Sequence, residues 1–169
     1  MFDSCVLGVD PGMSALGLAA VGRRDRRPEI RFAATVRTAP DLAEEARLRL
    51  IHEAVRDAIA EHRPDAVAVE RVAWNRNQRT AMPVARATGV ILLAASQAGL
   101  RVEEYGPLEV KMAVTGQGNA DKAQVRDALT RLHGLREVPK DPDAADAIAV
   151  ALCHLTQSRL RRVAGGRIS

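Results

Sequence analysis

Short apolar runs alternate with longer amphipathic segments along this chain, and the two periods predict strands and helices respectively. The first three apolar runs are joined by short polar turns, which is typical of an antiparallel meander. Later runs are separated by helical segments, as in β–α–β crossovers. The predicted strands are residues 5–10, 16–22, 31–37, 66–70 and 101–105. The predicted helices are residues 42–62, 81–97, 107–115, 120–132 and 142–158.

Capping residues set the limits of the later helices. Asn119 is the expected N-cap of the fourth helix. Asp141 caps the last helix, with Pro142 in the preferred first position. At 169 residues the chain has the length of one domain with one core. We therefore expect a single α/β domain over residues 1–158, with a five-stranded mixed sheet flanked by helices. A flexible basic tail is expected over residues 159–169.

Four carboxylates occur where predicted apolar elements begin or end. Asp10 closes the first strand and Glu70 closes the fourth, while Asp143 and Asp146 open the last helix. Carboxylates are seldom buried unless they are paired or bound to a metal. Residues three apart share one helix face, so both helical acids can point at the same ion. The sequence therefore predicts one cation site made by these four residues, called the four acids below.

The ligand type of the four acids indicates the metal. All four supply oxygen, with no histidine or cysteine beside them, which favours Mg²⁺ or Mn²⁺ over zinc. Mg²⁺ usually takes only one or two carboxylates, so four predict two ions about 3.5–4 Å apart, as in metal-assisted phosphodiester hydrolysis. A simpler interpretation makes Asp143 a helix N-terminal charge and Asp10 a turn residue. It leaves Glu70 unexplained.

The charge balance favours an anionic partner such as nucleic acid. There are 25 Lys and Arg against 21 Asp and Glu, a net charge of +4. Because the arginines greatly outnumber the lysines, the excess also fits a compositional bias. No apolar run reaches the roughly 18 residues of a membrane span, and no signal-peptide pattern occurs, so we expect a cytoplasmic protein without a membrane partner. Cys5 and Cys153 are expected as buried free thiols.

Motifs over residues 6–157 follow one another in a recognisable order. They are Gly8-Val9-Asp10-Pro11-Gly12, Val69-Glu70-Arg71-Val72, Glu104-Tyr105, Val110-Lys111, the segment 116–125 and Asp143-Ala144-Ala145-Asp146-Ala147. With this spacing the chain resembles the bacterial Holliday-junction resolvases of the RuvC family. The resemblance implies a ribonuclease-H-like fold, a homodimer and metal-dependent nicking of two opposed strands of a four-way DNA junction. It also implies a branch-migration helicase as partner, and metal-binding catalytic roles for the four acids.

Two lysines are assigned to DNA by the same resemblance. Lys111 and Lys122 match family lysines that act at the DNA backbone near the scissile site. They are two of only three lysines in the chain, and they flank the glycine-rich loop at residues 116–118. An ammonium group that reaches a phosphate is a reasonable use of them. The alternative is that both are solvated helix-surface residues.

The polar loop after Glu70 predicts a second DNA contact. Trp74 is one of only four aromatic residues, and its polar neighbours make it a poor core residue. It is placed to stack on an unpaired base, with Arg76 and Arg79 on phosphates and Asn77 in the same DNA-binding loop. Because an alanine precedes Trp74 where the family often has an aromatic, the residue that wedges the junction stays open.

Three other functions would share part of this sequence pattern. A nucleotide-binding protein of the actin and sugar-kinase type needs a second glycine-rich phosphate loop, which residues 100–169 do not supply. A ribonuclease-H-like nuclease that acts on RNA would share the fold and the four acids. A non-catalytic junction-binding module would gain nothing from acids concentrated against phosphates. Substrate tests distinguish the last two.

Overall fold

The computed structural model describes residues 5–25, 27–72 and 78–165, and it describes no side chains for residues 78–80 or beyond Ser158. The strands are β1 (Cys5–Asp10), β2 (Ala15–Arg24), β3 (Arg27–Arg37), β4 (Ala66–Glu70) and β5 (Arg101–Tyr105). The helices are α1 (Glu44–His62), α2 (Gln78–Gln97), α3 (Pro107–Thr115), α4 (Lys122–Arg131) and α5 (Pro142–Gly165). The sheet has the order β3-β2-β1-β4-β5. Antiparallel pairs join β1, β2 and β3, and parallel pairs join β1, β4 and β5. The predicted five-stranded mixed sheet is confirmed.

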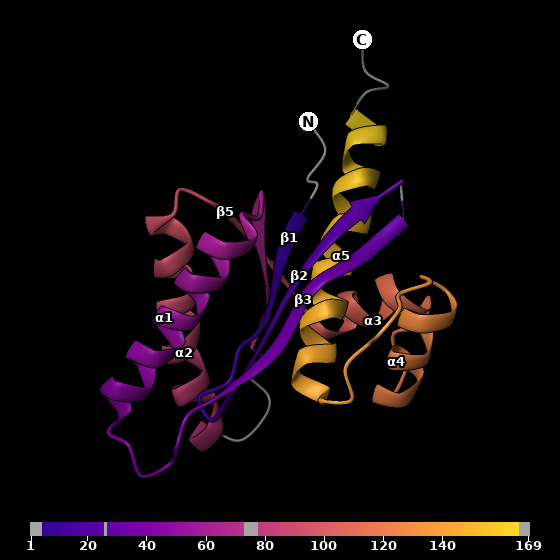
Figure 1. Ribbon diagram of the computed structural model, residues 1–169. Coiled ribbons are helices and arrows are strands. Elements are labelled where there is room, and N and C mark those ends of the chain that lie inside the picture. The colour runs from indigo at the N-terminus through magenta and orange to yellow at the C-terminus, as the bar shows by residue number, and fades with distance from the viewer. Residues whose placement is uncertain (1–4, 26, 73–77, 166–169) are drawn as a thin grey trace.

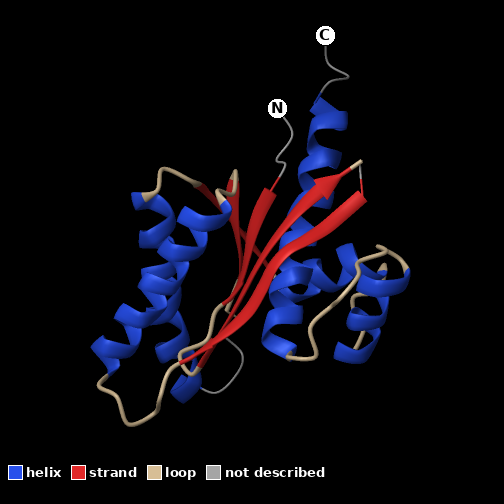
Figure 2. Ribbon diagram, viewed as in Figure 1, coloured by secondary structure: helices blue, strands red, loops and turns tan. Residues whose placement is uncertain are grey.

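Helices cover both faces of the sheet (Figures 1 and 2). Helices α1 and α2 pack on one face, and α3, α4 and α5 pack on the other. Side chains alternate along a strand, so Leu7 and Val9 pack with α1 and α2 while Val6 packs with α5. Strand β1 is therefore apolar on both faces, which explains its continuous apolar run.

Two strand glycines allow α5 to lie directly on the sheet. A Cβ atom on Gly8 would come under 3.0 Å from the backbone oxygen of Ala147 and from Ala151. A Cβ atom on Gly17 would come under 3.0 Å from the backbone oxygen of Asp143. Close approach of two backbones is a common reason for glycine inside a strand. The first turn of α5 is thereby placed against the ends of β1 and β2.

Several element ends differ from the prediction. The hairpin between β2 and β3 is tighter, because Arg24 pairs with Arg27 where a polar turn was expected. The N-cap of α4 is Asp121, not Asn119, which was wrong. The Asp121 carboxylate accepts the Gln124 backbone N–H at 2.8 Å, while the Gln124 side chain accepts the Asp121 N–H at 2.9 Å. This reciprocal capping box satisfies two helix-end donors at once.

The last helix is longer than predicted, and both cysteines are buried. Helix α5 continues to Gly165, so the first part of the predicted tail, residues 159–165, is helical. The flexibility of the tail stays a prediction. Cys5 and Cys153 are both buried and free, as expected. Among the helices of the described residues, none has the length and apolar character that a membrane crossing needs.

Candidate active site

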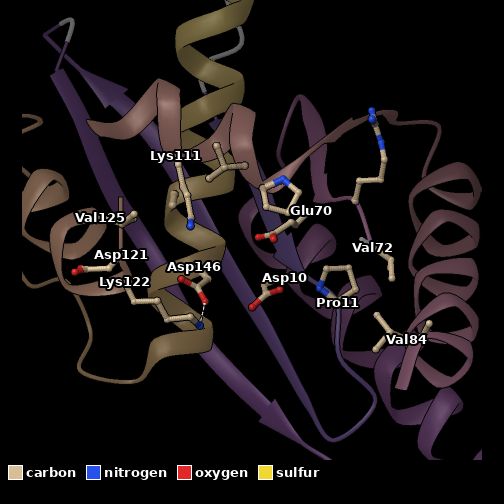
Figure 3. A pocket seen from close by; sticks show the side chains of 15 residues that line it. Asp10, Pro11, Glu70, Val72, Val84, Lys111, Asp121, Lys122, Val125 and Asp146 are labelled. Atoms are coloured by element: carbon tan, nitrogen blue, oxygen red, sulfur yellow. Dashed lines mark hydrogen bonds and ion pairs between the residues drawn. The ribbon is translucent and has the colours of Figure 1, made fainter. Parts of the chain in front are cut away.

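A pocket of about 730 Å³ opens at the edge of the sheet where β1 and β4 end (Figure 3). Strands β1 and β4 are parallel and pair through Val9 and Val69, so the residue that follows each of them reaches the same edge. Those next residues are Asp10 and Glu70. Among the described residues, seven charged side chains line the pocket. Five of them come from five different elements, namely Asp10, Glu70, Lys111, Lys122 and Asp146, and the other two are Arg71 and Asp121.

The strand pleat explains why both strand-end acids point toward α5. Gly8 faces α5 and pairs with Ala68, which belongs to the core cluster on the same side. Asp10 and Glu70 lie two residues further along these strands, and residues two apart share a face. Both carboxylates therefore emerge on the side of the sheet that carries α5 and Asp146.

The lysines enter from the other helices. Lys111 lies on α3, and Lys122 is the first residue of α4. The Lys122 ammonium donates a hydrogen bond to the Asp146 carboxylate at 2.7 Å. This hydrogen bond raises the pKa of Lys122 above its usual value. The pocket thus sets its carboxylates, called the acidic floor below, beside cationic side chains, and both lysines that the resemblance assigned to DNA line it.

Burial and mutual repulsion make the acidic floor electrostatically unfavourable without a cation. Burial, followed by the charges of Glu70, Asp146 and Asp143, raises the pKa of Asp10 to about 8. Burial and the Asp146 charge also raise the pKa of Glu70. Such shifts occur where a low-dielectric site gathers like charges. A bound cation would remove this repulsion.

The raised pKa of Asp10 predicts that Asp10→Asn stabilises the metal-free protein at high pH. The folded state binds this proton more tightly than the unfolded state, so wild-type stability falls as the pH rises from about 4 through about 8. Removing the charge should raise the free energy of unfolding by roughly 1–3 kcal/mol at pH 8.5 in EDTA. The difference should shrink toward pH 4. Thermal unfolding across this pH range checks it, and a destabilised variant at pH 8.5 would contradict the electrostatic account.

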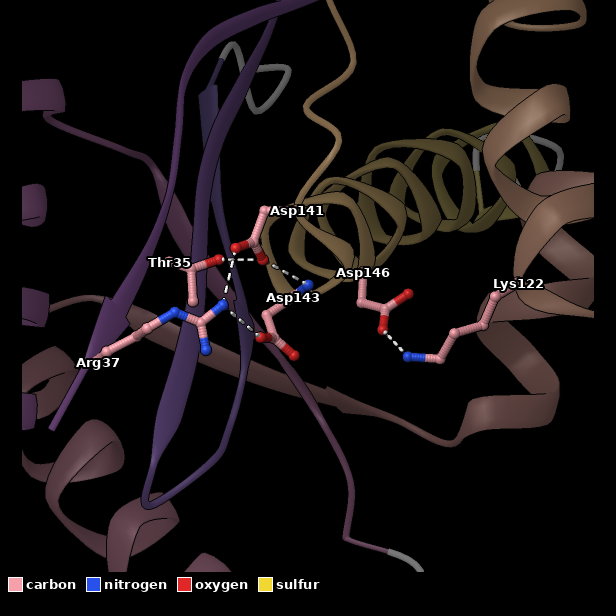
Figure 4. A network of polar contacts seen from close by, with 6 residues as sticks. All are labelled: Thr35, Arg37, Lys122, Asp141, Asp143 and Asp146. Atoms are coloured by element: carbon pink, nitrogen blue, oxygen red, sulfur yellow. Dashed lines mark hydrogen bonds and ion pairs between the residues drawn. The ribbon is translucent and has the colours of Figure 1, made fainter. Parts of the chain in front are cut away.

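The fourth acid, Asp143, lies in the first turn of α5 beside a separate group of polar residues (Figure 4). It is not among the residues that line the pocket. Its carboxylate lies 4.0 Å from the Arg37 guanidinium. Its charge still contributes to the raised pKa of Asp10, so the two acids are electrostatic neighbours. The structure thus brings three of the four acids to the pocket itself and places the fourth next to it.

Comparison with known proteins identifies the family. The model of the family described as "Crossover junction endodeoxyribonuclease RuvC" matches residues 6–154. This chain belongs to the RuvC family. RuvC of Salinispora arenicola is 49% identical over 94% of each chain. RuvC of Nocardia farcinica is 47% identical, over 92% of this chain and 82% of the relative.

Solved structures agree with the family assignment. Thermus thermophilus RuvC in complex with a Holliday junction substrate matches with a TM-score of 0.87 and 36% identity, over 94% of this chain and 96% of that one. A yeast mitochondrial Holliday junction resolvase matches with a TM-score of 0.70 at 13% identity, which supports the fold alone. The ribonuclease-H-like fold is confirmed. Family membership makes this RuvC protein a metal-dependent endodeoxyribonuclease, and the kinase-like and RNA-directed alternatives are set aside.

The donor chemistry of this RuvC site fits a hard divalent ion. Carboxylate oxygens are the ligands that Mg²⁺ and Mn²⁺ prefer, and no histidine or cysteine is among the described residues that line the pocket. In the described part of the chain, no three acidic, histidine or cysteine side chains are grouped to enclose an ion as they stand. Two of the acids instead face cations of the protein: Asp146 faces Lys122, and Asp143 faces Arg37.

The structure also shows residues that the sequence did not reveal as neighbours of the site. Thr35 and Arg37 of β3 contact Asp141, which was predicted only as a helix cap. Thr35 and Arg37 are two residues apart on a predicted strand, so the sequence indicates that they share one face of the sheet. It does not indicate which helix covers that face. Three residues of the predicted DNA loop, Trp74, Arg76 and Asn77, lie outside the described residues. Arg79 lies on α2, and its side chain also falls outside them.

Proposed function

We propose that this RuvC protein resolves four-way DNA junctions by two symmetric nicks, each a metal-assisted hydrolysis of one phosphodiester. The observation that carries the proposal is the convergence of Asp10, Glu70 and Asp146 with two lysines on one open pocket. The buried carboxylates are suited to bind metal cations, and the lysine ammonium groups are suited to bind the DNA phosphate that is cut beside them. T. thermophilus RuvC, which was solved in complex with a Holliday junction substrate, shares the fold over nearly the whole chain.

The four acids are proposed to bind two Mg²⁺ or Mn²⁺ ions. Such ions would supply an activated water and a stabilising charge for the leaving 3′ oxygen, and hydrolysis of the P–O3′ bond would leave a 5′-phosphate and a ligatable nick. Asp10 is the best candidate for a shared ligand, because the charges of the other three acids all act on it. The ammonium groups of Lys111 and Lys122 are proposed to bind phosphate oxygens beside the cut.

The loop after β4 is proposed to contact the junction centre. Trp74 would stack on an unpaired base, and Arg76, Asn77 and Arg79 would contact the backbone. The loop joins β4, which ends in Glu70, to α2. Residues on both sides of it, Val72 among them, line the pocket, so bases held by the loop would lie near the acids. Trp74→Ala should therefore reduce junction cleavage more than binding to plain duplex.

A homodimer fits a substrate that needs two symmetric cuts. A two-fold dimer supplies two identical sites through one self-complementary interface. Helix α2 presents the exposed apolar side chains of Met82 and Leu93, with open space around Gly89 between them. Met82 and Gly89 are seven residues apart, about two helical turns, and Gly89 and Leu93 are four apart, about one turn, so all three share one helix face. We place the dimer interface on this face of α2. A protein that makes paired cuts yet sediments as a monomer at micromolar concentration would contradict the dimer.

The cellular setting follows from the same role. A branch-migration helicase is the proposed partner, because junctions must be moved to positions where they are cut. The cytoplasm is the proposed location. Stimulation of cleavage by such a helicase on a mobile junction would support the partnership, and equal rates with and without it would count against it.

Incubation with defined substrates tests the proposed function. The substrates are an immobile four-way DNA junction, a junction with a mobile core, a matched duplex and an RNA–DNA hybrid, each with Mg²⁺, Mn²⁺ or EDTA. The mobile core covers the case in which cleavage depends on local sequence. We expect metal-dependent paired nicks on junctions alone. Cutting of the hybrid would instead indicate an RNA nuclease, and binding without cutting would indicate a structural module.

A further inference from the structure

Three residues on adjacent strands form a row that leads from the pocket to the edge of the sheet. Asp10 pairs with Gly17, and Gly17 pairs with Thr35. Directly paired residues point to the same face of a sheet, here the face that carries α5. Gly17 has no side chain, and the backbone oxygen of Asp143 lies under 3.0 Å from the position that a Cβ atom on Gly17 would take. The backbone of Asp143 therefore lies over the middle of this row, between Asp10 and Thr35.

The outer end of the row contacts the first turn of α5 through Asp141. The Thr35 hydroxyl donates to Asp141 Oδ1 at 2.6 Å, and the same oxygen accepts the backbone N–H of Asp143 at 3.1 Å. Arg37 Nη2 donates to Asp141 Oδ2 at 2.9 Å (Figure 4). Both carboxylate oxygens of Asp141 are thus engaged. We call Thr35, Arg37 and Asp141 the Asp141 network.

We propose that the Asp141 network is a positioning device that holds the backbone of Asp143 beside Asp10, so that the Asp143 carboxylate can reach a cation bound there. This inference rests on the proposed function, in which Asp143 is a metal ligand. The first four N–H groups of a helix have no partner within the helix, and helix ends fray. The network supplies a partner for the Asp143 N–H and ties that partner to β3. A ligand fixed in place loses less conformational freedom on binding, so the cation binds more tightly.

The network is not needed to keep α5 on the sheet. Residues further along the helix, such as Ile148, Val150 and Leu155, are almost fully buried in the core. Their packing provides most of the free energy that docks the helix. Loss of one hydroxyl at the first turn should therefore leave the fold intact while it loosens Asp143. None of the three network residues lines the pocket, so they act through Asp143 and not on the substrate.

Titration calorimetry with Mn²⁺ on DNA-free, metal-free protein tests the proposal. Thr35→Val keeps the side-chain shape but removes the hydroxyl, and Thr35→Ser keeps the hydroxyl. We expect about a fivefold weaker Mn²⁺ affinity for Thr35→Val and near wild-type affinity for Thr35→Ser. Thr156→Val is the matched control, because it removes a hydroxyl that contacts the Leu152 carbonyl at 2.9 Å near the other end of α5. Its affinity should be unchanged.

Asp143→Asn separates failure of this inference from failure of the proposed function. Loss of Mn²⁺ affinity in Asp143→Asn, with Thr35→Val within twofold of wild type, would overturn the positioning role and leave the metal site intact. Unchanged affinity in Asp143→Asn would overturn the assignment of Asp143 as a ligand, and the inference with it. Equal weakening in Thr35→Val and Thr35→Ser would overturn the hydroxyl-specific role. Asp141→Ala removes every network contact at once and should weaken Mn²⁺ affinity more than Thr35→Val does.

Discussion

Replacing any one of the four acids by its amide is expected to lower the rate of junction cleavage by about 10³-fold or more. The variants are Asp10→Asn, Glu70→Gln, Asp143→Asn and Asp146→Asn. Each keeps the size of the side chain but removes one anionic ligand from the proposed metal site. Single-turnover cleavage of a mobile-core junction with Mg²⁺ or Mn²⁺ measures the loss. The effect should be largest for Asp10, on which the charges of the other three acids converge.

Junction binding in EDTA should be retained in all four variants, because each removes a negative charge that opposes the phosphates. Asp127→Asn is the matched control. It neutralises an exposed acid on α4 that pairs with Arg131, away from the pocket lining, and should cleave at the wild-type rate. Loss of binding in every acid variant would indicate a structural role for the acids. Near-normal cleavage in any one of them would remove that residue from the proposed metal site.

The closeness of the acids was largely predictable, because the order and direction of the strands determine which strand ends lie side by side. Asp10 and Glu70 end parallel strands, and the carboxyl ends of parallel strands meet at one edge of a sheet. Asp146 follows from the amphipathic pattern of α5, which has one face for the sheet. The roles of Lys111 and Lys122 depended on the family resemblance, since a helix-surface lysine has no periodic signal of its own. The structure places both at the pocket.

The surroundings of Asp143 were not predictable, because they depend on strand register. The contact between Thr35 and Asp141 requires that β3 pair with β2 so that Thr35 lies opposite Gly17. A register shift between Ala20 and Val21 interrupts this pairing. Such a shift changes which residues lie opposite one another, and apolar periodicity alone does not reveal it. The error at the N-cap of α4 had a different cause: Asp121 and Gln124 have the spacing of a capping box, and that signal outweighs Asn119.

Gly17→Ala is expected to impair both stability and cleavage, although it adds only one methyl group. The new Cβ atom would come under 3.0 Å from the backbone oxygen and carbonyl carbon of Asp143, and 3.2 Å from the Cβ atom of Asp10. Backbone atoms cannot rotate away as a flexible side chain can, so the first turn of α5 must shift outward. Overpacking of this kind typically costs about 1–3 kcal/mol of stability. A displacement of about 1 Å at a reacting centre costs about 10²-fold in rate.

Gly22→Ala separates this steric effect from the general cost of replacing a strand glycine. Gly22 lies on the same strand, but its added Cβ atom would meet the guanidinium end of the Arg31 side chain, an exposed and flexible group that can shift. Thermal unfolding and single-turnover cleavage of both variants at saturating Mg²⁺ provide the comparison. We expect Gly22→Ala to match wild type in cleavage and Gly17→Ala to be about 10²-fold slower. Equal cleavage by the two would mean that the first turn of α5 tolerates displacement, and close docking on Gly17 would then have no part in placing Asp143.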